Sequence, residues 1–239
     1  MNLLLLSNST NVGQGYLEHA WDAVLPALDG IDELVFVPYA LADHDAYTAK
    51  VREAFAPHGI AVRGAHESSS PAATVADAAA VFVGGGNTFR LLDRVISLGL
   101  DDALRAHSEA GRPYLSASAG TNLAAPSIRT TNDMPIVFPG RFEALGLVPF
   151  QINCHYLDAD PSSTHAGETR ALRLTEYLEE NETPVVALRE GTWIRVADGR
   201  FTIGGEAVAA DRGPALLFAP GQEPHEISGE VTALLTAAR

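Results

Sequence analysis

Short apolar runs alternate with amphipathic stretches through the first half of the chain. The runs contain few polar side chains, which is typical of strands buried on both faces of a parallel sheet; they lie at 3–6, 33–39, 60–62, 80–83 and 114–117. Apolar residues recur at helical spacing between them, and helices are therefore predicted at 16–28, 43–56, 71–79, 88–98 and 100–110. Such alternation indicates an α/β fold with a largely parallel sheet and helices on both faces.

The pattern changes after residue 118. Shorter apolar segments predict strands at 147–152, 185–189, 193–196, 201–203 and 216–219, with helices at 167–180 and 231–238. Gly/Asp turns such as Asp198-Gly199 favour antiparallel strands and hairpins in this part. No Pro/Gly/Ser-rich linker, repeat or low-complexity segment separates the two halves, so we expect a single domain at 1–239.

A serine among small residues stands where the strand at 114–117 gives way to a helix. Ser118 is followed by Ala119 and Gly120, which is typical of a nucleophile elbow, although Ser116 occupies the place of the first glycine in G-x-S-x-G. Such a turn projects the hydroxyl above the sheet edge and places the next amide in the first turn of a helix. Acyl transfer needs this nucleophile and adjacent oxyanion donor. The alternative is a closely packed strand–helix turn without chemistry.

A second turn follows the preceding strand. Gly84, Gly85, Gly86 and Asn87 connect that strand to a helix, at the sheet edge where ligands bind in open α/β folds. Backbone amides in such a turn could cradle a phosphate, but the G-x-G-x-x-G spacing and a Walker lysine are missing. The remaining interpretations are an oxyanion donor facing Ser118 and a tight turn only.

A nucleophilic serine requires a general base and an acid that orients it. His155 follows the strand at 147–152 and is the stronger candidate base, whereas His165 lies in a polar loop. The other histidines show no partner and are expected mostly at the surface. Glu190 and Asp133 are both candidate acids, and the position of Glu190 at a strand end favours it.

Two further side chains have alternative interpretations. Arg170 lies near the start of the helix predicted at 167–180, where a guanidinium and a helix N-terminus could bind a carboxylate; an ordinary surface arginine is the alternative. Cys154 is not at an elbow and is interpreted as a buried thiol.

Composition limits the function classes. The 239 residues include 46% hydrophobic residues, enough for a full core, and a net charge of −14 argues against nucleic-acid and anionic-membrane partners. The single cysteine rules out an intramolecular disulfide and suits a reducing compartment. No signal peptide or apolar stretch of membrane-spanning length is recognised, so a cytoplasmic location is expected.

Taken in order, six sequence blocks resemble the peptidase E family of α-aspartyl dipeptidases. They are LLLLSNST near the N-terminus, GGGNTFRLL (84–92), SASAGTNLAAPSIRTTNDMPIV (116–137), LGLVPFQINCH (145–155), GETRALR (167–173) and EGTWI (190–194). The resemblance is nearly full length. It implies a three-layer fold similar to class I glutamine amidotransferases and a serine hydrolase that cleaves dipeptides with an N-terminal aspartate.

The resemblance also implies roles for individual residues. Ser118 is the expected nucleophile, His155 the base and Glu190 the acid; the amides of Gly86 and Ala119 form the oxyanion hole. The expected substrate-binding residues are Arg170, which binds the β-carboxylate, Asn87 and Asp133. Ser116 stands where the family has glycine, and Cys154 where it commonly has proline. Neither change removes a reacting atom.

Several alternatives stay open at this point. A cyanophycinase-like β-aspartyl isopeptidase is the nearest enzymatic alternative, and a non-catalytic protein that binds an acidic metabolite is the alternative from another class. We expect no metal or other cofactor, a small dipeptide as the partner, and a monomer or a homodimer. The segment at 158–165 is the expected place for a loop that closes over the substrate.

Overall fold

A large mixed sheet forms the centre of the computed structural model, which describes residues 1–160, 162, 167–209 and 211–237. Its order is β12-β9-β8-β1-β5-β4-β2-β3. The bounds are β1 (Asn2–Leu6), β2 (Glu33–Val37), β3 (Ala61–Gly64), β4 (Val81–Val83), β5 (Pro113–Ala117), β8 (Thr192–Ala197), β9 (Arg200–Gly205) and β12 (Gly229–Glu230). β1 to β5 run parallel, and β8, β9 and β12 extend the sheet by antiparallel pairing. The expected largely parallel α/β sheet is confirmed.

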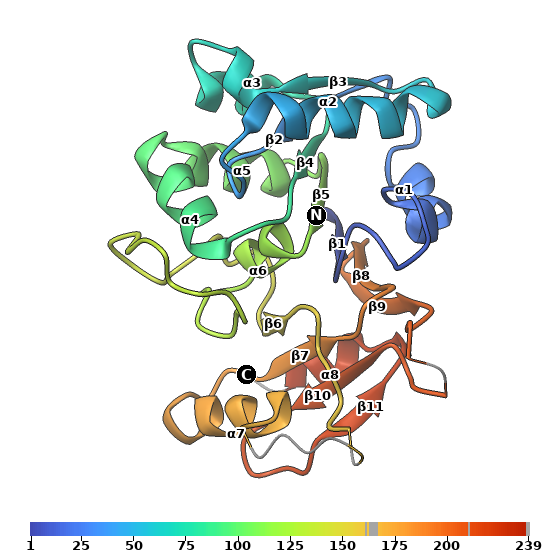
Figure 1. Ribbon diagram of the computed structural model, residues 1–239, viewed down its shortest axis with the longest axis vertical. Helices are drawn as coiled ribbons and strands as arrows, with labels where there is room; N and C mark the ends of the chain where they lie inside the picture. Colours follow the sequence, from blue (N-terminus) through green and yellow to red (C-terminus); the bar gives the residue numbers. More distant parts are fainter. Residues whose placement is uncertain (161, 163–166, 210, 238–239) are drawn as a thin grey trace.

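Helices cover both faces of this sheet. One face carries α1 (Trp21–Ala27) and α2 (His44–Phe55), whose apolar side chains join one core cluster. The other face carries α3 (Pro71–Asp77), α4 (Thr88–Ser97), α5 (Leu100–Glu109) and α6 (Ala119–Ala124), which join a second cluster. Figure 1 shows α1 and α4 on opposite sides of the central strands. Short 3-10 turns lie at η1 (Glu18–Ala20), η2 (Ala56–His58) and η3 (Ala65–Glu67).

A smaller sheet occupies the lower half of Figure 1. Its order is β11-β10-β7-β6, with β6 (Gln151–Asn153), β7 (Val185–Leu188), β10 (Ala215–Phe218) and β11 (His225–Ile227). The helix α7 (Arg170–Glu180) packs against it, and α8 (Thr232–Ala237) follows β12. The second core cluster contains residues of both sheets, including Leu5 of β1 and Ile152 of β6. The single domain at 1–239 stays a prediction.

Some expected elements are shorter or paired differently. The strand expected at 147–152 is reduced to β6, because the Leu147 amide donates to the carbonyl of Ala124, the last residue of α6, at 2.9 Å and not to a neighbouring strand. The strand expected at 185–189 pairs parallel with β6, not only antiparallel. The helix expected at 16–28 is α-helical only over α1. The hydrophobic pattern does not predict β11 and β12, because these strands have only three and two residues and are largely exposed.

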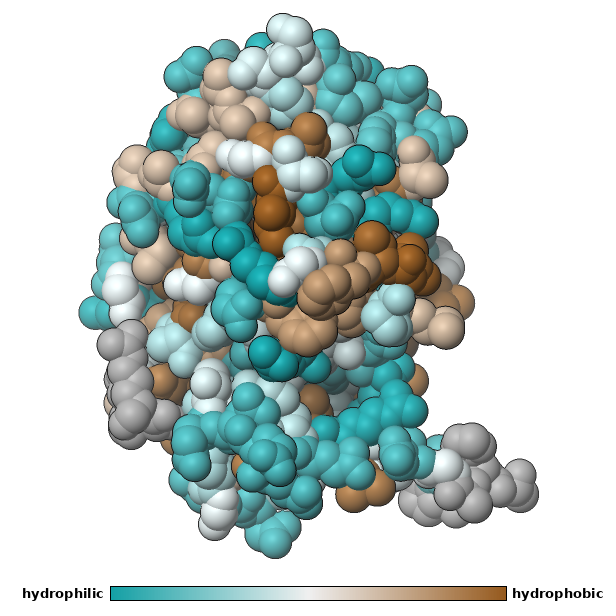
Figure 2. All heavy atoms as spheres, turned by 90° about the vertical axis from the view of Figure 1, so that its left-hand side faces the viewer, coloured by the Kyte–Doolittle hydropathy of each residue, from teal (hydrophilic) through white to brown (hydrophobic). Residues whose placement is uncertain are grey.

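The surface carries a hydrophobic area on the face shown in Figure 2. Apolar residues gather near its middle. Among the exposed apolar residues of the protein, Met134, Ile136 and Phe138 belong to the segment between α6 and β6. None of the helices in the described part of the chain combines the length and the apolar character needed to cross a bilayer.

Candidate active site

Ser118 occupies a sharp turn between β5 and α6. Its backbone has φ 53° and ψ −110°, a region that residues with a side chain rarely adopt. Its amide donates to the Leu6 carbonyl at 3.1 Å, so the turn is fixed to the end of β1. A Cβ on Gly120 would lie 2.3 Å from the Val83 carbonyl oxygen, and glycine is therefore required for α6 to begin so close to β4.

The serine at position 116 fits this turn through hydrogen bonds of its own. Ser116 is fully buried, and its hydroxyl lies 2.9 Å from the Thr121 hydroxyl. Thr121 donates in turn to the Leu6 carbonyl at 2.7 Å. Ser116 therefore connects β5 to α6, and both its own hydroxyl and that of Thr121 have a hydrogen-bond partner.

A chain of two short hydrogen bonds connects Ser118, His155 and Glu190. The Nε2 atom of His155 lies 2.8 Å from Ser118 Oγ, and its Nδ1 atom lies 2.7 Å from Glu190 Oε1. A carboxylate can only accept at Nδ1, so Nδ1 carries the proton and Nε2 is left to accept from the serine hydroxyl. The distances match those of a nucleophile, a base and an orienting acid.

The position of His155 depends on a residue that the sequence pattern did not single out. The His155 backbone has a positive φ of 54°, and its amide donates to Ser7 Oγ at 3.0 Å. Ser7 is fully buried after β1 and donates to the Leu188 carbonyl of β7 at 3.1 Å. Ser7 therefore connects the larger sheet to the base at the end of β6.

Cys154, the neighbour of His155, is buried and donates to the Ser118 carbonyl over 3.5 Å. Burial raises the pKa of its thiol well above the usual value, followed by a smaller contribution from the charge of Asp133. A thiol that stays protonated is a poor nucleophile. The expectation of a buried thiol is confirmed.

The glycine turn presents an amide beside the serine. Gly86 has φ 137°, and a Cβ on it would lie 2.6 Å from the Ala40 carbonyl oxygen. Gly85 donates its amide to Tyr47 Oη at 2.9 Å, which fixes the turn. In the described part of the chain, the amides of Gly86 and Ala119 donate to no other protein group, so both are available to an oxyanion.

Asp133 and Asn87 meet at the N-terminus of α4. Asn87 Oδ1 accepts from the Arg90 amide at 3.0 Å, and its Nδ2 donates to the Met134 carbonyl at 2.9 Å. Asp133 Oδ2 accepts from the amide and the hydroxyl of Thr88 at 2.7 and 2.5 Å. Asn87 thus fixes the segment that carries Asp133, while Asp133 Oδ1 makes no hydrogen bond to any described residue.

One cavity of about 410 Å³ joins most of these groups. Its lining includes Ser118, His155, Gly86 and Asp133. It also includes residues that the sequence pattern did not single out, among them Tyr16, Tyr47 and Lys50.

Arg170 does not line the Ser118 cavity. It lies at the first position of α7 and borders a neighbouring cavity of about 390 Å³ with Asp158, Asp160 and Arg173. Burial lowers the pKa of its guanidinium, and the charge of Asp133 opposes this shift, which places Arg170 within electrostatic reach of Asp133. His165 and half of the closing loop expected at 158–165 lie outside the described residues.

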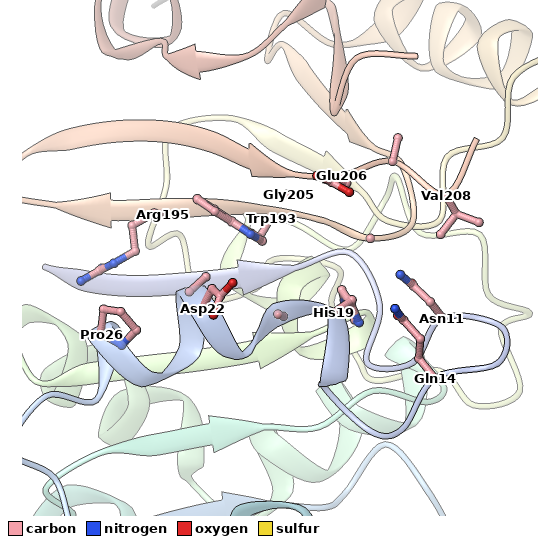
Figure 3. Close-up of a pocket in the computed structure, with 14 residues that line it drawn as sticks. Asn11, Gln14, His19, Asp22, Pro26, Trp193, Arg195, Gly205, Glu206 and Val208 are labelled. Carbon is pink, nitrogen blue, oxygen red and sulfur yellow. The ribbon is translucent and has the colours of Figure 1, made fainter. Parts of the chain in front are cut away.

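A larger cavity lies beside Gly191, the residue after Glu190. It measures about 700 Å³ and separates α1 from β8 and β9, with Trp193 and Arg195 across from Asp22 (Figure 3). It reaches Gly191 but contains neither Ser118 nor His155. The arrangement of reactive groups, and not cavity size, therefore identifies the candidate active site.

The sequence matches the model of Peptidase family S51 over residues 3–204. A protein from Streptomyces coelicolor named Peptidase E is 60% identical over 95% of this chain and 91% of its own length. A Drosophila melanogaster protein named "Probable alpha-aspartyl dipeptidase" is 50% identical over 82% of both chains.

Solved structures show the same fold at lower identity. The structure of a peptidase from an acI-B1 Actinobacterium has a TM-score of 0.65, with 14% identity over 95% of this chain and 94% of that chain. A structure from Listeria monocytogenes EGD-e has a TM-score of 0.64, with 21% identity over 86% of this chain and 98% of that chain. With the family model covering most of its length, the chain belongs to Peptidase family S51.

Proposed function

We propose that this protein is a serine-type dipeptidase that hydrolyses Asp-Xaa dipeptides through an acyl-enzyme on Ser118. The observation that carries the proposal is the hydrogen-bond chain from Ser118 through His155 to Glu190, with distances of 2.8 and 2.7 Å. Membership of a peptidase family and the names of the relatives support the same reaction class.

The first half-reaction forms an ester. His155 Nε2 takes the proton from Ser118 Oγ as this oxygen attacks the peptide carbonyl carbon, and Glu190 stabilises the resulting imidazolium. The carbonyl oxygen becomes an oxyanion that accepts from the amides of Gly86 and Ala119. Nε2 then protonates the leaving nitrogen as the C–N bond breaks. Water activated by the same nitrogen hydrolyses the ester and restores Ser118.

The charges around the cavity support a preference for an N-terminal aspartate. Asp133 Oδ1 is available to the α-ammonium group of the substrate, because only Oδ2 is bonded to Thr88. Arg170 is the cation that we assign to the β-carboxylate, because it is the first residue of α7 and the negative charge of Asp133 contributes to its electrostatic environment. Asn87 fixes the Asp133 segment through Met134. The relative named as an alpha-aspartyl dipeptidase supports this assignment.

Neither alternative function is favoured by the relatives reported above, whose names describe peptidases. A cyanophycinase-like isopeptidase would use the same serine, histidine and glutamate on a differently linked substrate, whereas a non-catalytic binding protein would leave them without a chemical role. The short hydrogen bonds from His155 to Ser118 and to Glu190, beside an Ala119 amide that none of the described residues occupies and that can bind an oxyanion, support chemistry over binding alone.

We also propose a cytoplasmic location and a small-molecule substrate without nucleic-acid or membrane partners. The net charge of −14 and the single free thiol, Cys154, support this proposal. Monomer and homodimer both stay open, and light scattering on the purified protein separates them.

The deciding experiment compares hydrolysis of α-Asp p-nitroanilide with the Asn, Glu and β-Asp analogues. The proposal predicts turnover of the α-Asp substrate by the wild type and its loss in Ser118→Ala. Ser97→Ala, an exposed serine on α4, is the matched control and should keep full activity. Preferred turnover of the β-linked substrate would favour the isopeptidase, and binding of an Asp dipeptide without turnover would favour the binding protein.

A further inference from the structure

Lys50 is the one lysine in a chain whose other 15 basic residues are all arginine. It lies on α2 and lines the same cavity as Ser118 and His155. Its ammonium group makes no ion pair with any carboxylate of the described residues. The cavity therefore contains a compact positive charge that none of the described carboxylates neutralises through an ion pair.

The Lys50 ammonium group contacts a tyrosine ring, which a second tyrosine connects to the glycine turn at 84–87. Lys50 Nζ lies 4.9 Å from the centre of the Tyr16 ring, a cation–π contact. The Tyr16 and Tyr47 hydroxyls are 3.3 Å apart, and Tyr47 accepts from the Gly85 amide at 2.9 Å. Lys50 is thus linked through two tyrosines to the turn that carries the Gly86 amide.

Lys50 and Asp133 approach the serine from opposite faces of the sheet. Tyr47 and Val51 of α2 belong to the core cluster on one face, whereas Leu91 of α4 belongs to the cluster on the other face. Asp133 is hydrogen-bonded to the first residue of α4. The cavity is therefore lined by a negative charge bonded to α4 and a positive charge on α2, and Ser118 lines it as well.

An Asp-Xaa dipeptide has a matching distribution of charge. Its aspartyl residue carries the α-ammonium group and stays on the serine after acylation, and its second residue carries the free α-carboxylate and leaves. Resting on the proposed function, which puts the ammonium group at Asp133, we propose that Lys50 binds the α-carboxylate of the second residue. Lys50 is then the residue that selects dipeptides over longer peptides and C-terminal amides.

This assignment predicts a specific change in substrate preference. The wild type should hydrolyse Asp-Leu with a kcat/KM well above that for Asp-Leu amide, in which the carboxylate is neutralised. Lys50→Gln should lower kcat/KM for Asp-Leu by about tenfold, mainly through KM, because a charged partner of the carboxylate is lost. The same variant should change kcat/KM for Asp-Leu amide by less than about twofold. Lys50→Arg should retain most of the preference for Asp-Leu.

Arg63→Gln is the matched control because it changes the net charge equally and lies on β3, outside the Ser118 cavity. It should leave both substrates unaffected. Equal losses on both substrates in Lys50→Gln, no loss on either, or the same loss in Arg63→Gln would each overturn the role of Lys50. A wild type that hydrolyses neither substrate would instead contradict the proposed function itself.

The single lysine also permits a direct measurement of binding. Reductive methylation with ¹³C-formaldehyde labels Lys50 and the α-amino group only, and the inactive Ser118→Ala protein can be titrated with uncleaved Asp-Leu. The Lys50 dimethylamine resonance should shift with Asp-Leu and should not shift with Asp-Leu amide at equal occupancy. An identical shift with both ligands would contradict the assignment.

Discussion

Asp158 and Arg189 form a two-pronged ion pair that joins the segment after His155 to the segment before Glu190. Arg189 Nε lies 2.7 Å from Asp158 Oδ2, and its Nη2 atom lies 2.8 Å from Oδ1. Arg189 is almost fully buried, at 2% exposure, and also approaches Glu226 at 3.2 Å. Because each partner is within three residues of a member of the proposed triad, the pair fixes the spacing between base and acid.

Asp158→Asn should therefore weaken both stability and activity. The substitution leaves a buried guanidinium with one carboxylate fewer, and we expect the free energy of unfolding to fall by about 2–3 kcal/mol. The kcat for an Asp-Xaa substrate should fall by about tenfold as the His155–Glu190 geometry loosens, with a smaller change in KM. Urea unfolding and steady-state kinetics measure the two effects.

Asp102→Asn is the control for this variant, because Asp102 is an exposed carboxylate whose ion pair with Arg105 lies within α5, away from the proposed triad. It should behave like the wild type in both measurements. An Asp158→Asn protein with unchanged kcat would show that the ion pair does not position the triad.

Gly120 sets the closest approach between α6 and β4. In Gly120→Ala the new methyl group would meet the Val83 carbonyl, so α6 must shift and Ser118 with it. We expect a loss of about 3 kcal/mol or more in the free energy of unfolding, together with a loss of activity in the folded fraction. Differential scanning calorimetry and an activity assay at low temperature test this expectation.

Gly30→Ala provides the comparison, because Gly30 has φ +74° but nothing within 4 Å of a new Cβ. Only backbone strain applies there, which costs about 1 kcal/mol. Equal stability losses in the two variants would mean that contact with Val83 does not limit position 120.

His107 makes stability depend on pH. Sequence reasoning placed most histidines at the surface, but His107 is fully buried and its Nε2 donates to the Pro113 carbonyl at 2.9 Å. Burial lowers the pKa of this imidazole, so the unfolded chain takes up a proton at a higher pH than the folded protein does. The contribution of His107 to the free energy of unfolding is therefore fully present above the unfolded pKa of about 6.5 and decreases as pH falls below it.

His107→Gln should reduce this dependence while keeping a donor for Pro113. Urea unfolding at pH 7.5 and 5.5 should show a smaller difference in the variant than in the wild type. Part of the difference should persist, because burial also lowers the pKa of His19 and His44. An unchanged difference would exclude His107 as a contributor.

Sequence reasoning reached the proposed triad because each member lies one or two residues after the end of a strand. Ser118, His155 and Glu190 come after β5, β6 and β7, and strand ends are positions that hydrophobic patterning can place. The parallel sheet was predictable for the same reason. Patterning also placed the Gly84–Asn87 turn beside Ser118, because consecutive strands of a parallel sheet end at one edge.

The features that could not be predicted from the sequence depend on contacts between residues far apart in the chain. Ser7 supports His155 from 148 positions away, and Asp158 meets Arg189 across 31 positions. Lys50 looks like an ordinary exposed helix residue until α2 is placed against Gly85 through Tyr47. Strands were predicted for β6, β7 and β10, but hydrophobic patterning does not tell which strands pair, so their separation into a smaller sheet was not predicted. The strand β11 was missed because it has only three residues.

The most direct test of the central claim is to trap the acyl-enzyme. The wild type, mixed with a saturating Asp ester and quenched in acid within its first turnovers, should carry one aspartyl group on Ser118, located by mass spectrometry of the proteolytic peptides. Ser118→Ala should carry none. An aspartyl group on Cys154 or on another residue, or rapid hydrolysis by Ser118→Ala, would contradict the account.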